Sequence, residues 1–147
     1  MVELGQVAPE FEAPTSAGTP LRLASLRGRP AILYFYPEAD TPGCTVESKA
    51  FRDLMPELDR HGVRVLGIST DDVPAQAHFA EKCSLPFPLV ADASKSITRS
   101  YGVLGKSGRA RRVSFFLDPD GRVVEIVDAS APAPHLEAAR RRYLGAQ

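Results

Sequence analysis

The feature that most restricts the fold of this chain is an apolar run that stops at a proline and gives way to a helical pattern. Residues 31–36, Ala-Ile-Leu-Tyr-Phe-Tyr, carry no charge, and such a run is typical of a β-strand buried on both faces. After residue 44, apolar side chains recur at helical spacing, at Val46, Ala50, Phe51, Leu54, Met55 and Leu58. This order predicts a central strand, a tight turn over 37–43 and a helix that stops near His61 and Gly62.

The rest of the chain continues the alternation of strands and helices. Strands are predicted at 63–68, 87–90, 113–117 and 122–127, and helices at 72–83, 92–101 and 134–144. The segment Asp118-Pro119-Asp120-Gly121 predicts a tight turn between the last two strands, because proline favours a type I turn and glycine accepts the left-handed conformation. Residues 11–14 and 21–23 flank a turn sequence and predict a small N-terminal hairpin.

These elements predict the fold class and the domain organisation. We expect an α/β protein with a central mixed β-sheet flanked by helices and an N-terminal β-hairpin. A chain of 147 residues is long enough to bury a core without disulfides or metals. We therefore expect residues 1–147 to form a single domain.

Charge and patterning argue against several functional classes. The 18 Lys and Arg residues balance the 18 Asp and Glu residues, so no overall field favours nucleic acid or anionic lipid. Residues 1–6 lack the basic and apolar regions of a signal peptide. The longest apolar run is far too short to cross a membrane. We expect a soluble, cytoplasmic protein without nucleic-acid or membrane partners.

Metal and cofactor sites find no support in the sequence. The two cysteines and three histidines are scattered along the chain without the spacing of metal ligands. The sequence contains no phosphate-binding loop and no dinucleotide fingerprint. We expect no metal and no cofactor, with His78 and His135 on the exposed sides of their helices.

Cys44 is the strongest candidate for a chemical role. It lies where the predicted helix begins, and unpaired N–H groups and the helix dipole favour an anion there. Cysteines at such positions have pKa values of about 3.5–7.5, which makes them reactive thiolates. The alternative is that Thr41-Pro42-Gly43 is simply a good helix start, with Thr41 as the cap and Pro42 in the first turn. Cys44 would then be a small buried apolar residue.

The segments around Cys44 resemble those of a known family. Pro37-x-x-x-Thr41-Pro42-x-Cys44, after Tyr34-Phe35-Tyr36, is similar to the active-site signature of the peroxiredoxins, above all the bacterioferritin-comigratory or peroxiredoxin Q group. The resemblance covers nearly the whole chain, and its other segments are Ala8-Pro9-Glu10-Phe11, Leu85-Pro86-Phe87-Pro88-Leu89 and Arg112-Val113-Ser114-Phe115. It implies a thioredoxin-like fold and the reduction of hydrogen peroxide and organic hydroperoxides by a cysteine.

The resemblance also implies roles for individual residues. Cys44 becomes the peroxidatic nucleophile, and Arg112 matches the arginine that activates it and binds peroxide oxygens. Thr41 can donate a hydrogen bond to sulfur or peroxide, and Pro37 is expected to shield the sulfur from water. Glu47 is one helical turn past Cys44, and a bare charge there would disfavour the thiolate. Glu47 therefore either orients an arginine or is a solvated residue of the first turn.

Cys83 raises the question of how oxidised Cys44 is recycled. Many members of the group carry a resolving cysteine five positions after the peroxidatic one, but this chain has Lys49 there. We expect Cys83 to resolve the sulfenic acid as an intramolecular disulfide, with thioredoxin as the reductant. The alternatives are that Cys83 is core packing in a one-cysteine peroxidase reduced by an external thiol, or that the protein is a thiol-based redox sensor. We expect a monomer, with a weak dimer as the alternative.

Overall fold

The computed structural model describes residues 1–145 and confirms the α/β architecture. The strands are β1 (Glu12–Pro14), β2 (Pro20–Arg22), β3 (Ala31–Phe35), β4 (Arg64–Ser69), β5 (Leu89–Ala91), β6 (Val113–Leu117) and β7 (Val123–Asp128). The helices are α1 (Pro42–Arg60), α2 (Val73–Lys82), α3 (Ser96–Ser100) and α4 (Ala133–Tyr143), with a 3-10 turn at Leu23–Leu26. β1 and β2 form the expected N-terminal hairpin.

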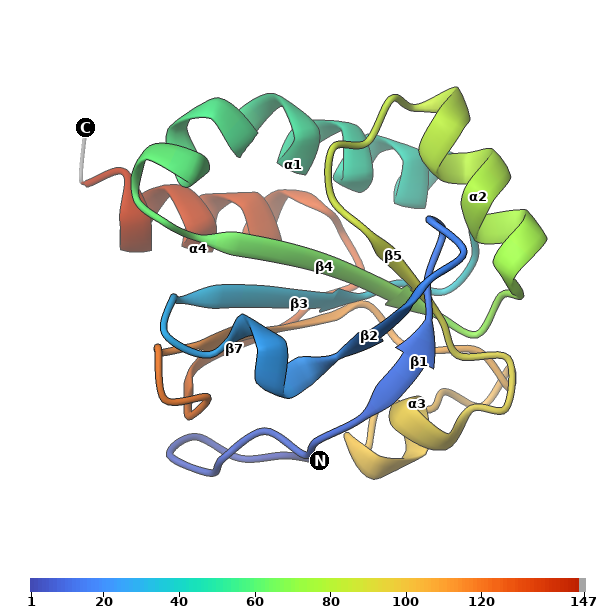
Figure 1. Ribbon diagram of the computed structural model, residues 1–147, viewed down its shortest axis with the longest axis horizontal. Helices are drawn as coiled ribbons and strands as arrows, with labels where there is room; N and C mark the ends of the chain where they lie inside the picture. The colour runs from blue at the N-terminus through green and yellow to red at the C-terminus, as the bar shows by residue number, and fades with distance from the viewer. Residues whose placement is uncertain (146–147) are drawn as a thin grey trace.

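The five-stranded sheet has the order β5-β4-β3-β6-β7. β3 pairs in parallel with β4, and β4 with β5, whereas β6 and β7 run antiparallel to their neighbours. The sheet is therefore mixed, as predicted. Helices α1 and α4 lie side by side over one face, and the hairpin with α3 lies on the other (Figure 1). β3 is the central strand, so the chain that leaves it emerges in the middle of the sheet edge.

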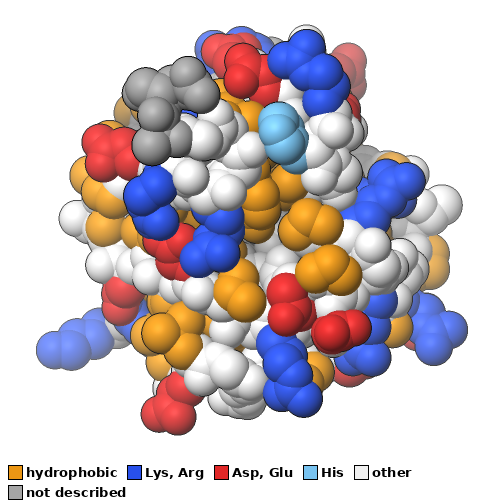
Figure 2. Space-filling view, turned by 90° about the vertical axis from the view of Figure 1, so that its left-hand side faces the viewer, with side chains coloured by type: hydrophobic (Ala, Val, Ile, Leu, Met, Phe, Trp, Pro, Cys, Tyr) orange, Lys and Arg blue, Asp and Glu red, His pale blue; other side chains and the backbone are white. Residues whose placement is uncertain are grey.

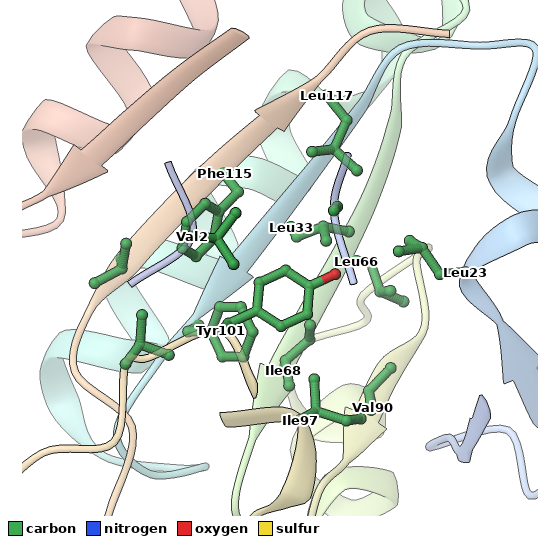
Figure 3. Packing of buried hydrophobic residues seen from close by; sticks show 14 of the residues in the cluster. Val2, Leu23, Leu33, Leu66, Ile68, Val90, Ile97, Tyr101, Phe115 and Leu117 are labelled. Atoms are coloured by element: carbon green, nitrogen blue, oxygen red, sulfur yellow. The ribbon is translucent and has the colours of Figure 1, made fainter. Parts of the chain in front are cut away.

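The apolar run in β3 is buried on both faces, as its composition predicts. Leu33 and Phe35 belong to the core on the hairpin side, where Tyr101 packs against Phe115 (Figure 3). Ile32 and Tyr34 belong to the core beneath the helices. Because strand side chains alternate between faces, one continuous apolar segment contributes to both cores.

Local signals determine several element ends. Asp72 caps α2, with its side chain accepting a hydrogen bond from Ala75 N at 3.0 Å. α1 stops at His61, followed by Gly62 with φ 71°. Gly121 closes the turn between β6 and β7 with φ 85°, where an L side chain would be strained. The predicted third helix is shorter than expected, because Asp92 to Ser94 form a turn in which the Asp92 carboxylate accepts from Ile97 N and Thr98 N.

The surface matches the balanced charge of the sequence. Figure 2 shows the end of the molecule that faces away from the start of α1, with acidic and basic side chains interspersed among apolar ones. Within residues 1–145, no helix has both the length and the apolar character needed to span a bilayer.

Candidate active site

Cys44 lies where the sequence predicts, in the first turn of α1 directly after the central strand. Pro42 and Gly43 precede it in the helix, and its side chain is 1% exposed. The N–H groups of Gly43 and Cys44 are at positions that have no intrahelical acceptor. They and the helix dipole direct partial positive charge toward the thiol.

Arg112 is held against the sulfur by contacts on three sides. Its Nη2 lies 3.4 Å from Cys44 Sγ, and its Nη1 donates to Glu47 Oε1 at 2.5 Å. Its Nε donates to the carbonyl oxygen of Ser130 at 2.8 Å. The guanidinium plane therefore has one orientation, and a planar fork with three separate donors is what makes this possible. Sequence reasoning weighed Glu47 as an orienting residue, and its contact with Arg112 agrees with that role.

Gly43 is a site residue that sequence reasoning missed. A Cβ atom added to Gly43 would lie 3.1 Å from Arg112 Nη2, which is tighter than ordinary van der Waals contact. Glycine in the first turn thus leaves the room that the guanidinium occupies beside Cys44. The sequence did not set Gly43 apart, because glycine is ordinary in a turn such as the one predicted over 37–43.

Thr41 differs from expectation in its hydrogen bonding. It is the N-cap residue of α1, but its side chain makes no capping hydrogen bond. Its hydroxyl donates to the carbonyl oxygen of Glu38 at 2.8 Å instead, so the predicted side-chain cap is wrong. A hydroxyl carries one proton and two acceptor lone pairs. With its proton engaged by Glu38, Thr41 offers the site an acceptor rather than a donor.

An open cavity of about 370 Å³ adjoins Arg112 and contains the predicted residue Pro37 in its wall. The wall also includes Lys106, Arg109 and Arg111, together with Asp128. Arg109 pairs with Glu38 at 3.4 Å and Arg111 with Asp128 at 2.9 Å. The guanidinium of Arg112 therefore connects the buried sulfur to a solvent-accessible space.

Glu47 is fully buried next to the site. Burial raises the pKa of Glu47 from 4.5 to about 7, and the opposing attraction of Arg112 limits that rise. Its second oxygen, Oε2, has no hydrogen-bond partner within residues 1–145. A carboxylate in this position binds Arg112 with one oxygen and leaves the other unsatisfied, at a cost in desolvation.

The two histidines expected on exposed helix faces differ in their exposure to solvent. His78 is exposed, with His78 Nε2 3.7 Å from Asp40 Oδ2. The prediction for His135 is wrong, since its side chain on α4 is fully buried. His135 Nε2 lies 2.8 Å from the carbonyl oxygen of Ala129, and Nδ1 lies 2.7 Å from Ser114 Oγ. Both ring nitrogens are thus satisfied, which permits burial of a polar ring.

Cys83 is at the end of α2, where it is the C-cap residue, and it too is 1% exposed. It belongs to the same apolar cluster as Cys44, and both are free thiols. The carbonyl oxygen of Cys83 accepts a hydrogen bond from Arg52 Nη1 at 2.7 Å. Ser84, the next residue, has φ 52°, an uncommon conformation for a residue with a side chain. The structure therefore places Cys83 in the same core as Cys44 without bonding the two.

Within the part of the chain that the structure describes, no three His, Cys, Asp or Glu side chains are grouped as metal ligands would be. The reactive elements are a buried thiol, a helix N-terminus and an oriented guanidinium. Together with the thioredoxin-like sheet, they define the class of thiol-dependent peroxidases.

Comparison with known proteins gives the family. The model of the AhpC/TSA family matches residues 4–126. A putative peroxiredoxin Bcp of Coxiella burnetii is 43% identical over 127 residues, covering 82% of this chain and 84% of the relative. Peroxiredoxin Bcp of Escherichia coli K12 is 38% identical over 141 residues, covering 91% and 90%.

Solved structures agree with the sequence comparison. Peroxidoxin BcpB of Mycobacterium tuberculosis superposes with a TM-score of 0.86 at 37% identity, covering 96% of this chain and 97% of that one. A cysteine mutant of Xanthomonas campestris Peroxiredoxin Q gives a TM-score of 0.82 at 33% identity, with coverage of 88% and 87%. The chain belongs to the AhpC/TSA family, among the Bcp or Q peroxiredoxins, and the predicted fold and enzyme class are confirmed.

Proposed function

We propose that this peroxidase reduces hydrogen peroxide and organic hydroperoxides at Cys44, that Cys83 resolves the product as an intramolecular disulfide, and that thioredoxin or a similar dithiol reduces the disulfide. The observation that carries the proposal is the contact of Arg112 Nη2 with Cys44 Sγ at 3.4 Å. It provides a fixed cation for the thiolate in a site that excludes most water.

In the first step, the thiolate of Cys44 attacks one oxygen of the peroxide. A sulfur–oxygen bond forms with the sulfur electron pair, and the oxygen–oxygen bond breaks. The leaving oxygen takes the electron pair of that bond and a proton from solvent to become an alcohol or water. Negative charge moves from sulfur to oxygen, so donors beside the sulfur stabilise the transition state. Arg112 Nη2 and the first-turn N–H groups supply these donors. The Thr41 hydroxyl, whose proton is held by Glu38, accepts a hydrogen bond from the peroxide O–H.

In the second step, the sulfenic acid on Cys44 condenses with the thiol of Cys83. A disulfide forms and water leaves, which protects Cys44 from further oxidation. A disulfide requires the two Cα atoms to lie within about 7 Å of each other. Cys83 follows the last turn of α2, and helix ends unwind more readily than helix centres. We propose that this end of α2 opens to bring Cys83 to Cys44.

Two findings favour organic as well as inorganic peroxides as substrates. The cavity beside Arg112, at about 370 Å³, has room for a small organic substituent. A structure of the Xanthomonas campestris relative is described by its alkyl peroxide reduction activity. Cys44, Arg112 and Cys83 belong to one chain, so we propose that a monomer carries out the steps up to the disulfide.

The test is mass spectrometry of the reduced protein after one equivalent of hydrogen peroxide and alkylation of the remaining thiols. We expect a peptide that links Cys44 to Cys83, and no alkylation of either residue. Cys44→Ser and Cys83→Ser proteins are the controls, and neither forms the linked peptide. Sulfenic or sulfinic acid on Cys44 with Cys83 fully alkylated would instead favour a one-cysteine enzyme. Oxidation without repeated turnover in a thioredoxin-coupled assay would favour a redox sensor.

A further inference from the structure

Behind Arg112 lies a buried group of polar side chains that the proposed cycle does not use. His135 from α4, Ser114 from β6 and Glu47 from α1 are all fully buried. His135 Nδ1 lies 3.8 Å from Glu47 Oε2. Because buried polar groups are costly unless they have partners, a histidine in this place calls for a reason.

The hydrogen bonds of His135 specify its tautomer. Nε2 faces a carbonyl oxygen, that of Ala129, so Nε2 carries the proton and donates. In the neutral ring Nδ1 is then an acceptor, and Ser114 donates its hydroxyl proton to it. Burial lowers the pKa of His135, and Arg112 lowers it further, against the raising effects of Ala129 and Asp128. The neutral ring is therefore the form expected at neutral pH.

His135 reaches Arg112 along two routes. Through Nε2 it holds the Ala129 carbonyl, and the next residue, Ser130, supplies the carbonyl that accepts from Arg112 Nε at 2.8 Å. His135 Nδ1 faces Glu47 Oε2 but cannot donate a hydrogen bond to it, because Nδ1 carries no proton and accepts from Ser114. Glu47 therefore directs its hydrogen bonding to Arg112 alone, at 2.5 Å.

We propose that His135 is a positioning residue of the peroxidase. It holds the Ala129–Ser130 backbone and does not compete with Arg112 for Glu47, so the guanidinium keeps its position beside Cys44 and the incoming peroxide. This inference rests on the proposed function of Arg112. Displacing a catalytic group by about 1 Å can cost up to 100-fold in rate, so a residue that holds the backbone beside one of the three Arg112 contacts and does not compete for a second can affect the reaction without touching substrate.

The test compares two reactions of Cys44 in variants of His135. Peroxide oxidation uses Arg112 both to favour the thiolate and to stabilise charge on the leaving oxygen, whereas alkylation by iodoacetamide depends on Arg112 only through the thiolate. Both second-order rate constants are measured in single turnover with hydrogen peroxide and iodoacetamide, and thermal unfolding of each variant is recorded. His61→Gln is the matched control, because His61 also contacts a backbone carbonyl, that of Glu57, but is exposed.

The variants test the two ring nitrogens of His135 separately. In His135→Gln the amide N–H can occupy the place of Nε2 and keep the bond to Ala129, whereas His135→Asn reaches only the Nδ1 position. We expect the peroxide rate constant to fall about 10-fold in His135→Asn and His135→Leu, but less than about threefold in His135→Gln. Alkylation should change less than about twofold in each, and His61→Gln should match the wild type in both reactions.

Each outcome bears on the inference. Selective loss of the peroxide reaction, with rescue by glutamine, supports it. A wild-type peroxide rate in His135→Asn would overturn it, and so would equal losses of both reactions in step with a lower unfolding temperature. If His135→Leu does not fold, the Asn and Gln proteins still decide the matter, since both keep a polar group in the site. Failure of the wild-type protein itself to oxidise Cys44 would instead refute the proposed function.

Discussion

The two cysteines of this chain are equally buried, yet they lie in surroundings of different chemistry. Cys44 is in the first turn of a 19-residue helix, with the guanidinium of Arg112 3.4 Å from its sulfur. Cys83 ends a 10-residue helix, and the hydrogen bonds it makes within residues 1–145 come from its backbone. Burial alone therefore does not distinguish the proposed peroxidatic thiol from the proposed resolving one. A fixed electropositive neighbour does.

The largest effects are expected from replacing each cysteine, because the two thiols act in different steps of the cycle. Cys44→Ser should lower peroxide consumption by more than about 10³-fold, because a serine hydroxyl is not ionised at neutral pH and attacks peroxide poorly. Cys83→Ser should abolish turnover with thioredoxin but leave the first oxidation of Cys44 within about twofold of the wild type. A thioredoxin-coupled assay and a single-turnover measurement test the two steps. Unchanged steady-state turnover in Cys83→Ser would remove Cys83 from the cycle.

The next effect tests whether the cation is what makes Cys44 different. Arg112→Lys keeps a charge but cannot reach sulfur, Glu47 and the Ser130 carbonyl together, so we expect the peroxide rate constant to fall about 10²–10³-fold. Arg111→Met is the control, because Arg111 is a neighbouring arginine whose partner is the exposed Asp128. The control should stay within about threefold of the wild type. Equal losses in both variants would mean that general positive charge at the cavity matters, not the orientation of Arg112.

How much of this could be read from the sequence depends on whether the signal is local. The central strand, the start of α1 and the turn at Gly121 follow from short patterns, and they place Cys44 correctly. The side chain of Thr41 was predicted wrongly because its hydroxyl turns to the Glu38 carbonyl, three residues before it, and makes no bond to the first-turn N–H groups. His135 was predicted wrongly because its burial depends on a partner far away in the sequence, Ser114 of β6, as well as on the nearby Ala129 carbonyl.

The role of Arg112 could not be predicted from a local pattern alone. The residues around it resemble a strand of the peroxiredoxins, but exposure tendencies alone favour a surface arginine. The contacts that bury it come from α1 and from the loop before α4. Gly43 and Ser130 matter only through Arg112, so no local pattern could assign them a role in advance.

The polar group beneath Cys44 should also carry a stability cost that the apolar surroundings of Cys83 do not. The pKa of Glu47 is raised from 4.5 to about 7 in the folded protein, so between these pH values the folded state binds more protons than the unfolded state. The free energy of unfolding must then fall as pH rises through this window, by on the order of 1–3 kcal/mol from this group. Glu47→Gln should remove that part of the slope.

Urea unfolding at several pH values between 4.5 and 8 measures this slope. Glu57→Gln is the matched control, since Glu57 is on the same helix but exposed. It should retain the wild-type pH dependence. A slope in Glu47→Gln equal to that of the wild type would show that Arg112 keeps Glu47 ionised throughout, and the polar site would then carry no pH-dependent cost.

The smallest effect concerns the stiffness of the Cys83 end. Asp40, in the loop before Cys44, bonds Lys82 Nζ at 2.7 Å, which ties that loop to the last turn of α2. Both groups are exposed, so the pair adds little to global stability, but it opposes the opening that brings Cys83 to Cys44. We expect Asp40→Asn to speed disulfide formation about two- to threefold, measured by rapid quench after peroxide oxidation, and high salt to have a similar effect on the wild type.

Glu125→Gln, which breaks an ion pair between β7 and α4, is the control and should leave this rate unchanged. A slower rate in Asp40→Asn would mean that the Asp40–Lys82 pair instead guides Cys83 toward Cys44. The part of α2 that opens would then lie away from this pair.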